Sequence, residues 1–408
     1  MTGLRSDRQV AARMLAKLRS GRGRDDPYAI YTMMRKMGPI LPTPWGSLLV
    51  TGYNACAELL KTSAWEAVGA NWRDEYQPGW RRHQAVVDLT DSMILMNAPE
   101  HTLQRRAVAP HMTMRAVNDL IPVITRLVDD RMDALEFALR HDGRADFAHL
   151  VSGPLPVSVM CALLGLPESD STHLDTLAHA LSAVQEFSPT VIQLQGADEA
   201  VTLLRNYLAD HVRHRPRAAS GLLAKLLEMS DRNCDGLRAD LLVAMLLGAG
   251  RDTSSAMLSS IALAMATHHD QGQWLKANLE AVPAAVHEVS RWDPAAQVVS
   301  RVAVHDSELA GIPVRRGQLA TALIGSAQRD PQILPDPDRL DLSRPPERIL
   351  TFGIGAHYCV GAVLAQLQGN LVMRAILERF PTLRLAGQVI RPRGIAFREV
   401  SSMLVELG

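Results

Sequence analysis

The sequence is poor in the features that mark secreted, membrane-spanning or nucleic-acid-binding proteins. Its 408 residues contain only four cysteines, which are far apart and form no CxxC pair: Cys56, Cys161, Cys234 and Cys359. This scarcity excludes a disulfide scaffold and predicts a cytoplasmic protein. No run of about 18 apolar residues occurs, so we expect no membrane span. Basic and acidic residues number 43 each, so no net charge would attract a nucleic acid or an anionic membrane.

The chain is rich in apolar residues at helical spacing. Hydrophobic residues make up 47% of it, which is enough for a large buried core. The pattern predicts helices over residues 117–138, 155–165, 196–215 and 238–268. Strand signals cluster at residues 45–51 and at 302–324 around a turn at 311–313, and the C-terminal 30 residues also look extended.

These proportions predict a mainly α protein with small β-sheets. No repeat, low-complexity segment or long linker divides the chain. We therefore expect a polar N-terminal segment, residues 1–26, followed by a single domain over residues 27–408. The N-terminal segment lacks the apolar stretch of a secretory signal.

The most informative segment is residues 352–361, Phe-Gly-Ile-Gly-Ala-His-Tyr-Cys-Val-Gly, which precedes an amphipathic helix. Cys359 is therefore expected where helix N–H groups and the macrodipole favour a thiolate over a thiol. The three glycines leave room for a flat ligand, and such a thiolate suits an axial ligand of haem iron. A buried structural cysteine is one alternative. A zinc site is another, but His357 and Cys359 supply only two of four ligands.

This segment resembles the haem-ligand loop of the cytochrome P450 monooxygenases, F-G-x-G-x-H-x-C-x-G, in their soluble bacterial form. The resemblance implies the single-domain cytochrome P450 fold and a haem b whose iron is axially ligated by Cys359. It also implies that the loop residues Phe352, Gly353, Gly361 and His357 contact this cofactor.

A second motif, Ala-Gly-Arg-Asp-Thr-Ser at residues 249–254, lies at the centre of the long helix expected over 238–268. Glycine is unfavourable in a helix interior, and Thr253 can bond back to a carbonyl one turn earlier, so we expect a local opening of the helix. A flexible helix with surface polar residues is the alternative. A dinucleotide-binding loop is excluded, because no strand precedes the motif and a third glycine is missing.

The motif resembles the family's [AG]-G-x-[DE]-T segment, which crosses the haem on its oxygen side. The resemblance implies that Ala249 and Gly250 lie against the cofactor. It implies that Thr253 holds dioxygen and that Asp252 relays protons from solvent as a general acid.

Charged pairs at helical spacing extend the resemblance. Glu288 and Arg291 lie three residues apart, on one helical face, and match the family's ExxR pair. In the family this pair locks the fold together with a later arginine, for which Arg344 is the candidate and Arg339 and Arg348 are alternatives.

The resemblance also implies a set of basic partners for the two haem propionates. His101 and Arg105 lie four residues apart in a segment that resembles the family's P-E-H-T-x-x-R stretch. Arg301 and His357 match the remaining partners. For each residue alone, a solvated surface charge is the alternative.

One segment departs from the family pattern. Residues 365–369 read AQLQG where relatives often have LAR-x-E. We expect the change to remove charges from the surface that meets the redox partner.

The family resemblance implies a monooxygenase that uses O2 and takes electrons from a ferredoxin and its NAD(P)H-dependent ferredoxin reductase. We expect a monomer that oxidises a mainly apolar small molecule, by analogy in secondary metabolism. The residues expected to line the substrate pocket are Met245, Gln297, Val298, Val299 and Phe187. Peroxide-driven oxidation and a non-catalytic haem-fold recruitment module remain as alternatives.

Overall fold

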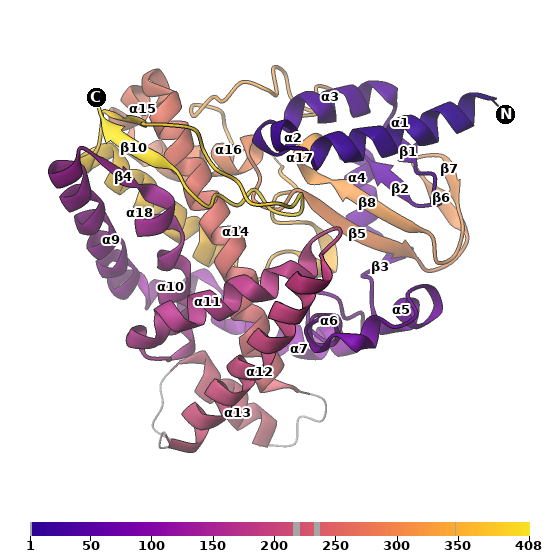
Figure 1. The fold of residues 1–408 in the computed structure, drawn as a ribbon, viewed down its shortest axis with the longest axis horizontal. Helices are drawn as coiled ribbons and strands as arrows, with labels where there is room; N and C mark the ends of the chain where they lie inside the picture. Colours follow the sequence, from indigo (N-terminus) through magenta and orange to yellow (C-terminus); the bar gives the residue numbers. More distant parts are fainter. Residues whose placement is uncertain (1, 215–220, 232–236, 347) are drawn as a thin grey trace.

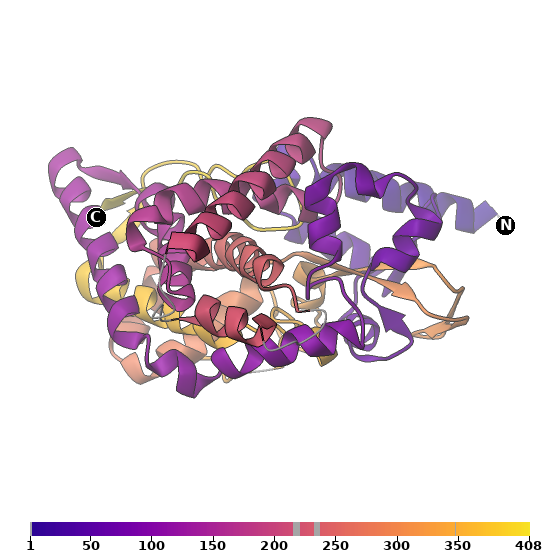
Figure 2. The ribbon, with the colours of Figure 1, turned by 90° about the horizontal axis from the view of Figure 1, so that it is seen from below.

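A computed structural model describes residues 2–214, 221–231, 237–346 and 348–408. Helices fill the left and lower part of the molecule in Figure 1, and a sheet lies to the right beside the N-terminal helices. The two termini lie at opposite ends of the molecule in Figures 1 and 2. Cys234 and the expected helix end at residue 215 lie outside the described residues.

The helical part is built around α14 (Ala239–Thr267), most of whose side chains are buried. It packs against α10 (Pro154–Leu164), α11 (Ser171–Leu181), α16 (Val282–Trp292) and α18 (Ala362–Arg379). The other long helices are α9 (Ile121–Asp142), α12 (Val191–His214) and α13 (Leu222–Asp231).

Shorter helices connect these elements and cover the sheet. They are α1 (Thr2–Leu18), α2 (Gly21–Asp25), α3 (Tyr28–Met37), α4 (Tyr53–Lys61), α5 (Ala70–Tyr76), α6 (Gln84–Thr90), α7 (Glu100–Val108), α8 (Met114–Asn118), α15 (His269–Lys276) and α17 (Ile324–Ala327). Single helical turns are η1 (Trp80–Arg82), η2 (Ala109–His111), η3 (Ala148–Ser152), η4 (Glu168–Asp170), η5 (Ser182–Gln185), η6 (Leu279–Ala281) and η7 (Gly355–His357).

The ends of α10 illustrate how local sequence sets the element bounds. Pro154 occupies the first helical position, where its fixed φ suits the helix and its missing N–H has no cost. Gly165 follows the last turn with a φ of 77°, a left-handed conformation that glycine adopts without strain. The expected helix over residues 155–165 is thus confirmed to within one residue at each end.

The main sheet has five strands in the order β1-β2-β8-β5-β3. Its strands are β1 (Ile40–Pro42), β2 (Leu48–Val50), β3 (Trp65–Glu66), β5 (Val298–Ala303) and β8 (Leu319–Leu323). Among the described strands, β2 and β8 alone pair in parallel, with Leu48 opposite Ala320. The smaller sheets join β4 (Arg144–Asp146), β10 (Leu404–Leu407) and β9 (Leu383–Leu385), and β6 (Ser307–Leu309) with β7 (Ile312–Val314).

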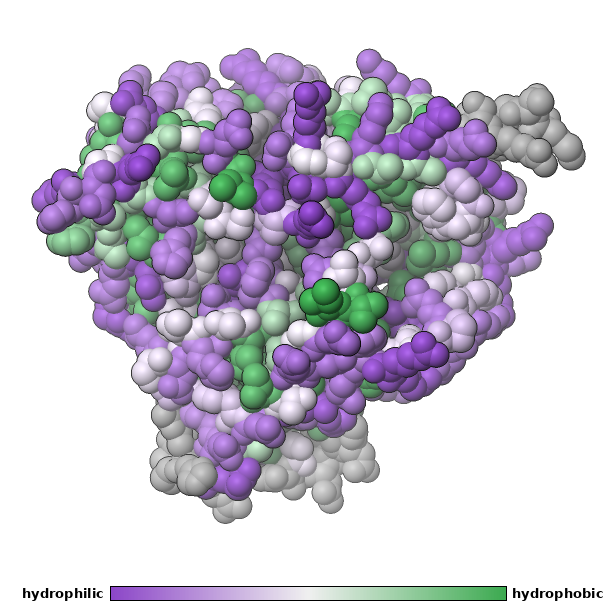
Figure 3. Space-filling view, viewed as in Figure 1, coloured by the Kyte–Doolittle hydropathy of each residue, from purple (hydrophilic) through white to green (hydrophobic). Residues whose placement is uncertain are grey.

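The polar N-terminal segment folds onto the sheet. Ala11, Leu15 and Leu18 of α1 are buried in a cluster with Tyr31 of α3 and Leu323 of β8. The face of the molecule shown in Figure 3 is mostly hydrophilic, and the apolar patches on this face are small and separate. Among the described helices, none combines the length and the apolarity that crossing a bilayer requires.

The expected strands are wrong in their bounds. The segment 45–51 contains a turn, closed by the bond from Gly46 N–H to the Thr43 carbonyl, before β2 begins. The segment 302–324 holds parts of four strands, and Pro313 belongs to β7 rather than to a turn. Proline is tolerated there because β7 pairs with β6 alone, so both are edge strands. The C-terminal 30 residues form only β9 and β10 as strands.

Candidate active site

The Cys359 loop is a tight turn that ends at the start of α18. Gly353 N–H donates to the Leu350 carbonyl, and Cys359 N–H donates to the Phe352 carbonyl, both at 2.8 Å. Gly353 and Gly355 have φ values of 71° and 79°, which explains glycine at both positions. Gly361 caps α18 with an ordinary negative φ and faces open space.

Cys359 is accessible as a residue, but its sulfur is partly shielded from water by the surrounding protein. The residue is exposed, yet the protein around its thiol raises the thiol's pKa. The Gly361 N–H and the charge of Arg105 act in the opposite direction, but they do not outweigh burial. The Gly361 N–H at the helix start thus favours the thiolate as expected, but burial shifts the balance toward the thiol. A bound metal cation is what deprotonates such a thiol.

Four basic side chains from three segments gather near this loop. His101 and Arg105 come from α7, Arg301 from β5 and His357 from η7. We call this group the basic cluster. The rings of His101 and His357 lie 4.2 Å apart, between centroids. Burial, Arg301, His101 and Arg105 together lower the pKa of His357 to about 3, and burial lowers the pKa of Arg301 to about 10.

The basic cluster fits an anionic partner. Within the described chain, no ion pair joins any of its members to a carboxylate, and the buried Nε2 of His101 has no hydrogen-bond partner. The arginines of the cluster carry its positive charge, and a charge buried without a counter-ion is costly unless an anion lies beside it. The carboxylates of haem propionates are such anions. The residues present therefore fit a haem whose iron meets Cys359.

On α14, three predicted residues form an accessible stripe. Met245, Ala249 and Thr253 follow one another at intervals of four and are half-buried, whereas most of their neighbours are buried. The Thr253 hydroxyl donates to the Ala249 carbonyl at 2.7 Å. The helix remains continuous, so the expected opening is absent. Gly250 lies against α10, since a Cβ there would meet the sulfur of Met160 at 3.0 Å.

Asp252 is almost fully buried in a network of charged groups. Its Oδ1 accepts from Arg251, while its buried Oδ2 has no hydrogen-bond partner. His179 of α11 and Glu399 of the C-terminal segment also reach this network. Neither His179 nor Glu399 belongs to a sequence motif, and only tertiary folding brings them to α14, so the sequence alone did not predict them.

Glu288 and Arg291 form a bidentate ion pair at 2.7 and 2.9 Å. Both are buried, and Arg291 also donates to the carbonyls of Gln328 and Pro337. The Nε of Arg344 approaches Glu288 Oε1 at 3.4 Å, although its N–H is not aligned for a hydrogen bond. Of the three candidate arginines, Arg344 is thus the one whose guanidinium reaches the pair. Arg339 contributes its carbonyl oxygen.

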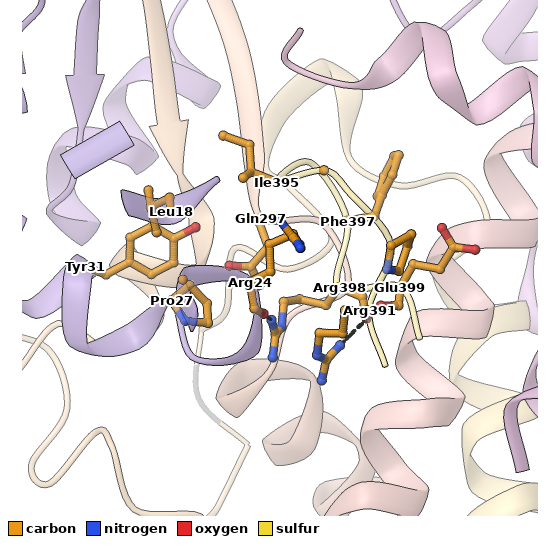
Figure 4. A pocket seen from close by; sticks show the side chains of 13 residues that line it. Leu18, Arg24, Pro27, Tyr31, Gln297, Arg391, Ile395, Phe397, Arg398 and Glu399 are labelled. Atoms are coloured by element: carbon orange, nitrogen blue, oxygen red, sulfur yellow. Dashed lines mark hydrogen bonds between the residues drawn. The ribbon is translucent and has the colours of Figure 1, made fainter. Parts of the chain in front are cut away.

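The remaining candidate substrate residues are not brought together. Gln297 is buried and donates to the Pro294 carbonyl at 2.7 Å. It lines a small cavity between the N-terminal helices and the C-terminal segment, where its amide lies near Tyr31 (Figure 4). Val298 packs toward the α1 cluster and Val299 toward the other side of the sheet. Phe187 lies exposed between η5 and α12.

The departure at residues 365–369 lies on α18 and points partly inward. Gln368 and Gly369 are buried, and a Cβ at Gly369 would lie 2.8 Å from a Val286 methyl carbon. The expectation that this segment changes the outer surface is therefore wrong for these two residues. Gly369 instead permits the close approach of α16 and α14.

Sequence relatives decide the family. A family model described as cytochrome P450 matches residues 273–393. The cytochrome P450 monooxygenase PikC of Streptomyces venezuelae is 32% identical over 368 residues, covering 88% of this chain and 85% of the relative. This chain belongs to the cytochrome P450 family. The polyketide biosynthesis cytochrome P450 PksS of Bacillus subtilis is 27% identical over 384 residues, covering 93% of this P450 and 91% of the relative.

A solved structure agrees with this membership. The crystal structure of CalO2 matches this P450 with a TM-score of 0.87 at 25% identity, covering 96% of this chain and 98% of that one. The expected P450 fold, mainly α with small sheets, is confirmed. This P450 is an oxidoreductase of the monooxygenase class, and its family implies haem b with a cysteine-ligated iron.

Proposed function

We propose that this P450 uses O2 to hydroxylate, or otherwise oxidise, a mainly apolar small molecule in secondary metabolism. The observation that carries the proposal is the convergence of the accessible Cys359 loop with the uncompensated basic cluster. The stripe of Met245 and Ala249 supports an apolar substrate. The printed role of the relative PksS, polyketide biosynthesis, supports a natural-product substrate for this chain.

Haem b would supply the oxidative chemistry: with two electrons and two protons, one oxygen atom of O2 goes to the substrate and the other leaves as water. Cys359 would hold the iron through its negatively charged sulfur. His101, Arg105, Arg301 and His357 would hold the propionates through charge-assisted hydrogen bonds.

The protons for this reaction would pass through Asp252 and Thr253. Asp252 has one carboxylate oxygen free of partners, so it can take up a proton without first breaking a bond at that oxygen. Thr253 is adjacent on the accessible stripe, and its hydroxyl can both donate and accept. Because general acids typically contribute roughly 10²- to 10⁴-fold in rate, loss of either group should be measurable.

Electrons would come from separate proteins, a ferredoxin and its NAD(P)H-dependent ferredoxin reductase. We further propose a monomer that acts in the cytoplasm. Arg106 and Arg348 are candidates for the surface that receives the acidic ferredoxin.

The first test is the absorption spectrum of the dithionite-reduced protein with and without carbon monoxide. We expect a strongly red-shifted Soret band, which Cys359→Ser should abolish. A band typical of a neutral axial ligand in the unaltered protein would contradict Cys359 as the ligand. Titration with macrolactones, terpenoids and fatty acids, followed by the Soret shift, would then identify the substrate class.

A second test separates the O2 pathway from peroxide-driven oxidation. With a bound substrate and surrogate redox partners, Thr253→Ala should lower product per NADPH and raise hydrogen peroxide release. Turnover driven by added peroxide should be far less affected. Unchanged coupling in Thr253→Ala would contradict the role of Thr253 and favour the peroxide-driven alternative.

A further inference from the structure

Arg251 lies at the centre of a charged group drawn from three segments of the chain. Its Nε donates to Asp175 of α11 at 2.9 Å, and its Nη1 donates to Glu399 of the C-terminal segment at 2.9 Å. The same Nη1 donates to Asp252, its neighbour on α14. Together with His179 of α11, these residues form what we call the Arg251 cluster.

His179 contacts this cluster through one ring nitrogen. Its Nδ1 lies 2.8 Å from Arg251 Nη1, 3.4 Å from Asp252 Oδ1 and 3.3 Å from Glu399 Oε1. Arginine only donates and ionised carboxylates only accept. Nδ1 can therefore accept from Arg251 when it carries no proton, or donate to a carboxylate when it does, but not both. His179 thus has two alternative hydrogen-bond arrangements that differ by one proton.

The side chains of the Arg251 cluster differ in their exposure to solvent. The His179 side chain is 49% exposed, whereas that of Asp252 is 2% exposed. Arg251 and Glu399 are also largely covered, at 10% and 14%. His179 is therefore the member most open to water, and histidine is the side chain that exchanges protons most readily near neutral pH.

The surrounding charges favour the protonated form of His179. Three carboxylates of the cluster face a single guanidinium, and Glu186, after η5, adds a fourth acidic group close enough to interact with Asp252. The hydrogen bond to Asp252 and the charge of Glu399 raise the pKa of His179, although burial and Arg251 act against this. The balance of these groups thus favours the arrangement in which Nδ1 carries a proton and donates to a carboxylate.

We propose that His179 is the residue through which protons pass from solvent to Asp252. The inference rests on the proton-delivery role proposed above for Asp252. In the transfer, the Nδ1–H bond of the His179 imidazolium breaks and an O–H bond forms on the Asp252 carboxylate. The neutral ring, now protonated at Nε2 alone, accepts from Arg251 at Nδ1. A hydronium ion of the solvent then returns a proton to Nδ1, which leaves water and restores the imidazolium. His179 acts through Asp252 and is thus a positioning and relay residue.

A metal site at the same residues is less consistent with the geometry. Ligand atoms of His179, Asp252 and Glu399 all lie within 4.8 Å of one another. However, the guanidinium of Arg251 already contacts all three, and a divalent cation would have to displace it. The positive charge that such a cation would bring is already present.

The first test measures the proton equilibrium of His179 directly. The haem-loaded, ferrous carbon monoxide form, labelled with 15N-histidine, is titrated by NMR, and the resonance absent from His179→Gln is assigned to His179. We expect it to titrate above about 6.5, the ordinary value for histidine, and to shift downward in Asp252→Asn. A titration that is the same in Asp252→Asn would overturn the coupling on which the relay depends.

The second test measures proton supply. NADPH oxidation is followed against pH with spinach ferredoxin in excess, so that electron supply does not limit the rate. We expect the rate to fall as pH rises through the NMR pKa of His179. His179→Gln should lose this inflection and lower the rate at acidic pH on the order of tenfold, less than the roughly 10²- to 10⁴-fold of a direct general acid.

His173→Gln is the matched control, because His173 is an exposed histidine of the same helix whose ring lies near Tyr207 and outside the cluster. It should keep the profile of the unaltered protein. If Asp252→Asn lowers the rate but His179→Gln keeps both rate and inflection, only the His179 inference fails. If Asp252→Asn has no effect, proton delivery through Asp252 is wrong, and the His179 inference fails with it.

Discussion

Arg301 of the basic cluster shows how burial of a charge can prepare a site for an anionic ligand. Arg301 is buried, and its side chain donates to the Ser300 carbonyl at 2.9 Å. Burial without a carboxylate partner lowers its pKa to about 10, which means that its charge is costly where it lies. An anionic group placed beside it removes that cost, so part of the affinity for haem should depend on this residue.

We therefore predict that Arg301→Gln weakens haem retention. Loss of a hydrogen bond to a charged group costs about 1.5–3 kcal/mol, which corresponds to roughly 10- to 150-fold in affinity. Haem transfer to excess apomyoglobin measures the effect as a shorter half-time. Arg315→Gln, an exposed arginine at the turn before β8, should leave the half-time unchanged. Equal half-times for both variants would show that Arg301 does not hold the cofactor.

At the scale of helices and strands, the contact of α18 with α16 and α14 explains why residue 369 is glycine. The sequence had suggested that this residue affects the outer surface, but it is buried. A Cβ at Gly369 would lie 2.8 Å from a methyl carbon of Val286, 3.1 Å from one of Ile261 and 3.3 Å from the terminal carbon of Met257. Glycine in a helix interior is unfavourable by about 1 kcal/mol relative to alanine. It is tolerated here because close helix packing needs the space.

Two glycine substitutions should therefore have opposite effects. Gly369→Ala should destabilise the protein, because overpacking of about 1–3 kcal/mol exceeds the gain in helix propensity. Gly196→Ala in α12 faces open space and should stabilise by about 0.5–1 kcal/mol. Urea unfolding of the haem-loaded variants, followed by circular dichroism, measures both. If Gly369→Ala stabilised the protein, α16 and α14 could move away from the added methyl group without a cost in free energy, and the prediction would be wrong.

For the molecule as a whole, Asp293 ties together segments that are distant in the sequence. It follows α16 and accepts hydrogen bonds from Tyr28 of α3, Ser260 of α14 and Arg398 of the C-terminal segment. Burial alone would raise the pKa of Asp293, but the charges of Arg398 and Arg391 hold this pKa well below its usual range. Its ionised form is therefore built into the fold.

Asp293→Asn should destabilise the protein at neutral pH by about 3–5 kcal/mol, because it leaves a buried arginine without its counter-charge. Since the native pKa is depressed, the contribution of Asp293 is complete above the unfolded value of about 3.9 and is lost as pH falls below it. The difference from the unaltered protein should narrow below about pH 4. Urea unfolding at several pH values tests this, with the exposed Asp129→Asn as control. A difference that stays constant from pH 7 to pH 3 would contradict the assignment.

Features that follow local rules could be predicted from the amino-acid sequence. Apolar spacing placed α9, α10 and α14, because helical periodicity is a property of neighbouring residues. The F-G-x-G-x-H-x-C-x-G segment pointed to Cys359 and to the P450 family, because the turn and the start of α18 are encoded in one contiguous stretch. The strands were placed less accurately, since their pairing partners are distant and edge strands tolerate residues such as Pro313.

Tertiary folding governs how charges and close contacts are distributed. It brought His179 and Glu399 to Asp252, buried Gln297 away from the accessible stripe of α14, and placed Gly369 between two helices. It also added burial, which favours the Cys359 thiol, to the helix N–H, which favours the thiolate, because desolvation depends on all the atoms that surround a group and not on its position along a helix. Such effects sum over the whole fold, so no local pattern in the chain contains them.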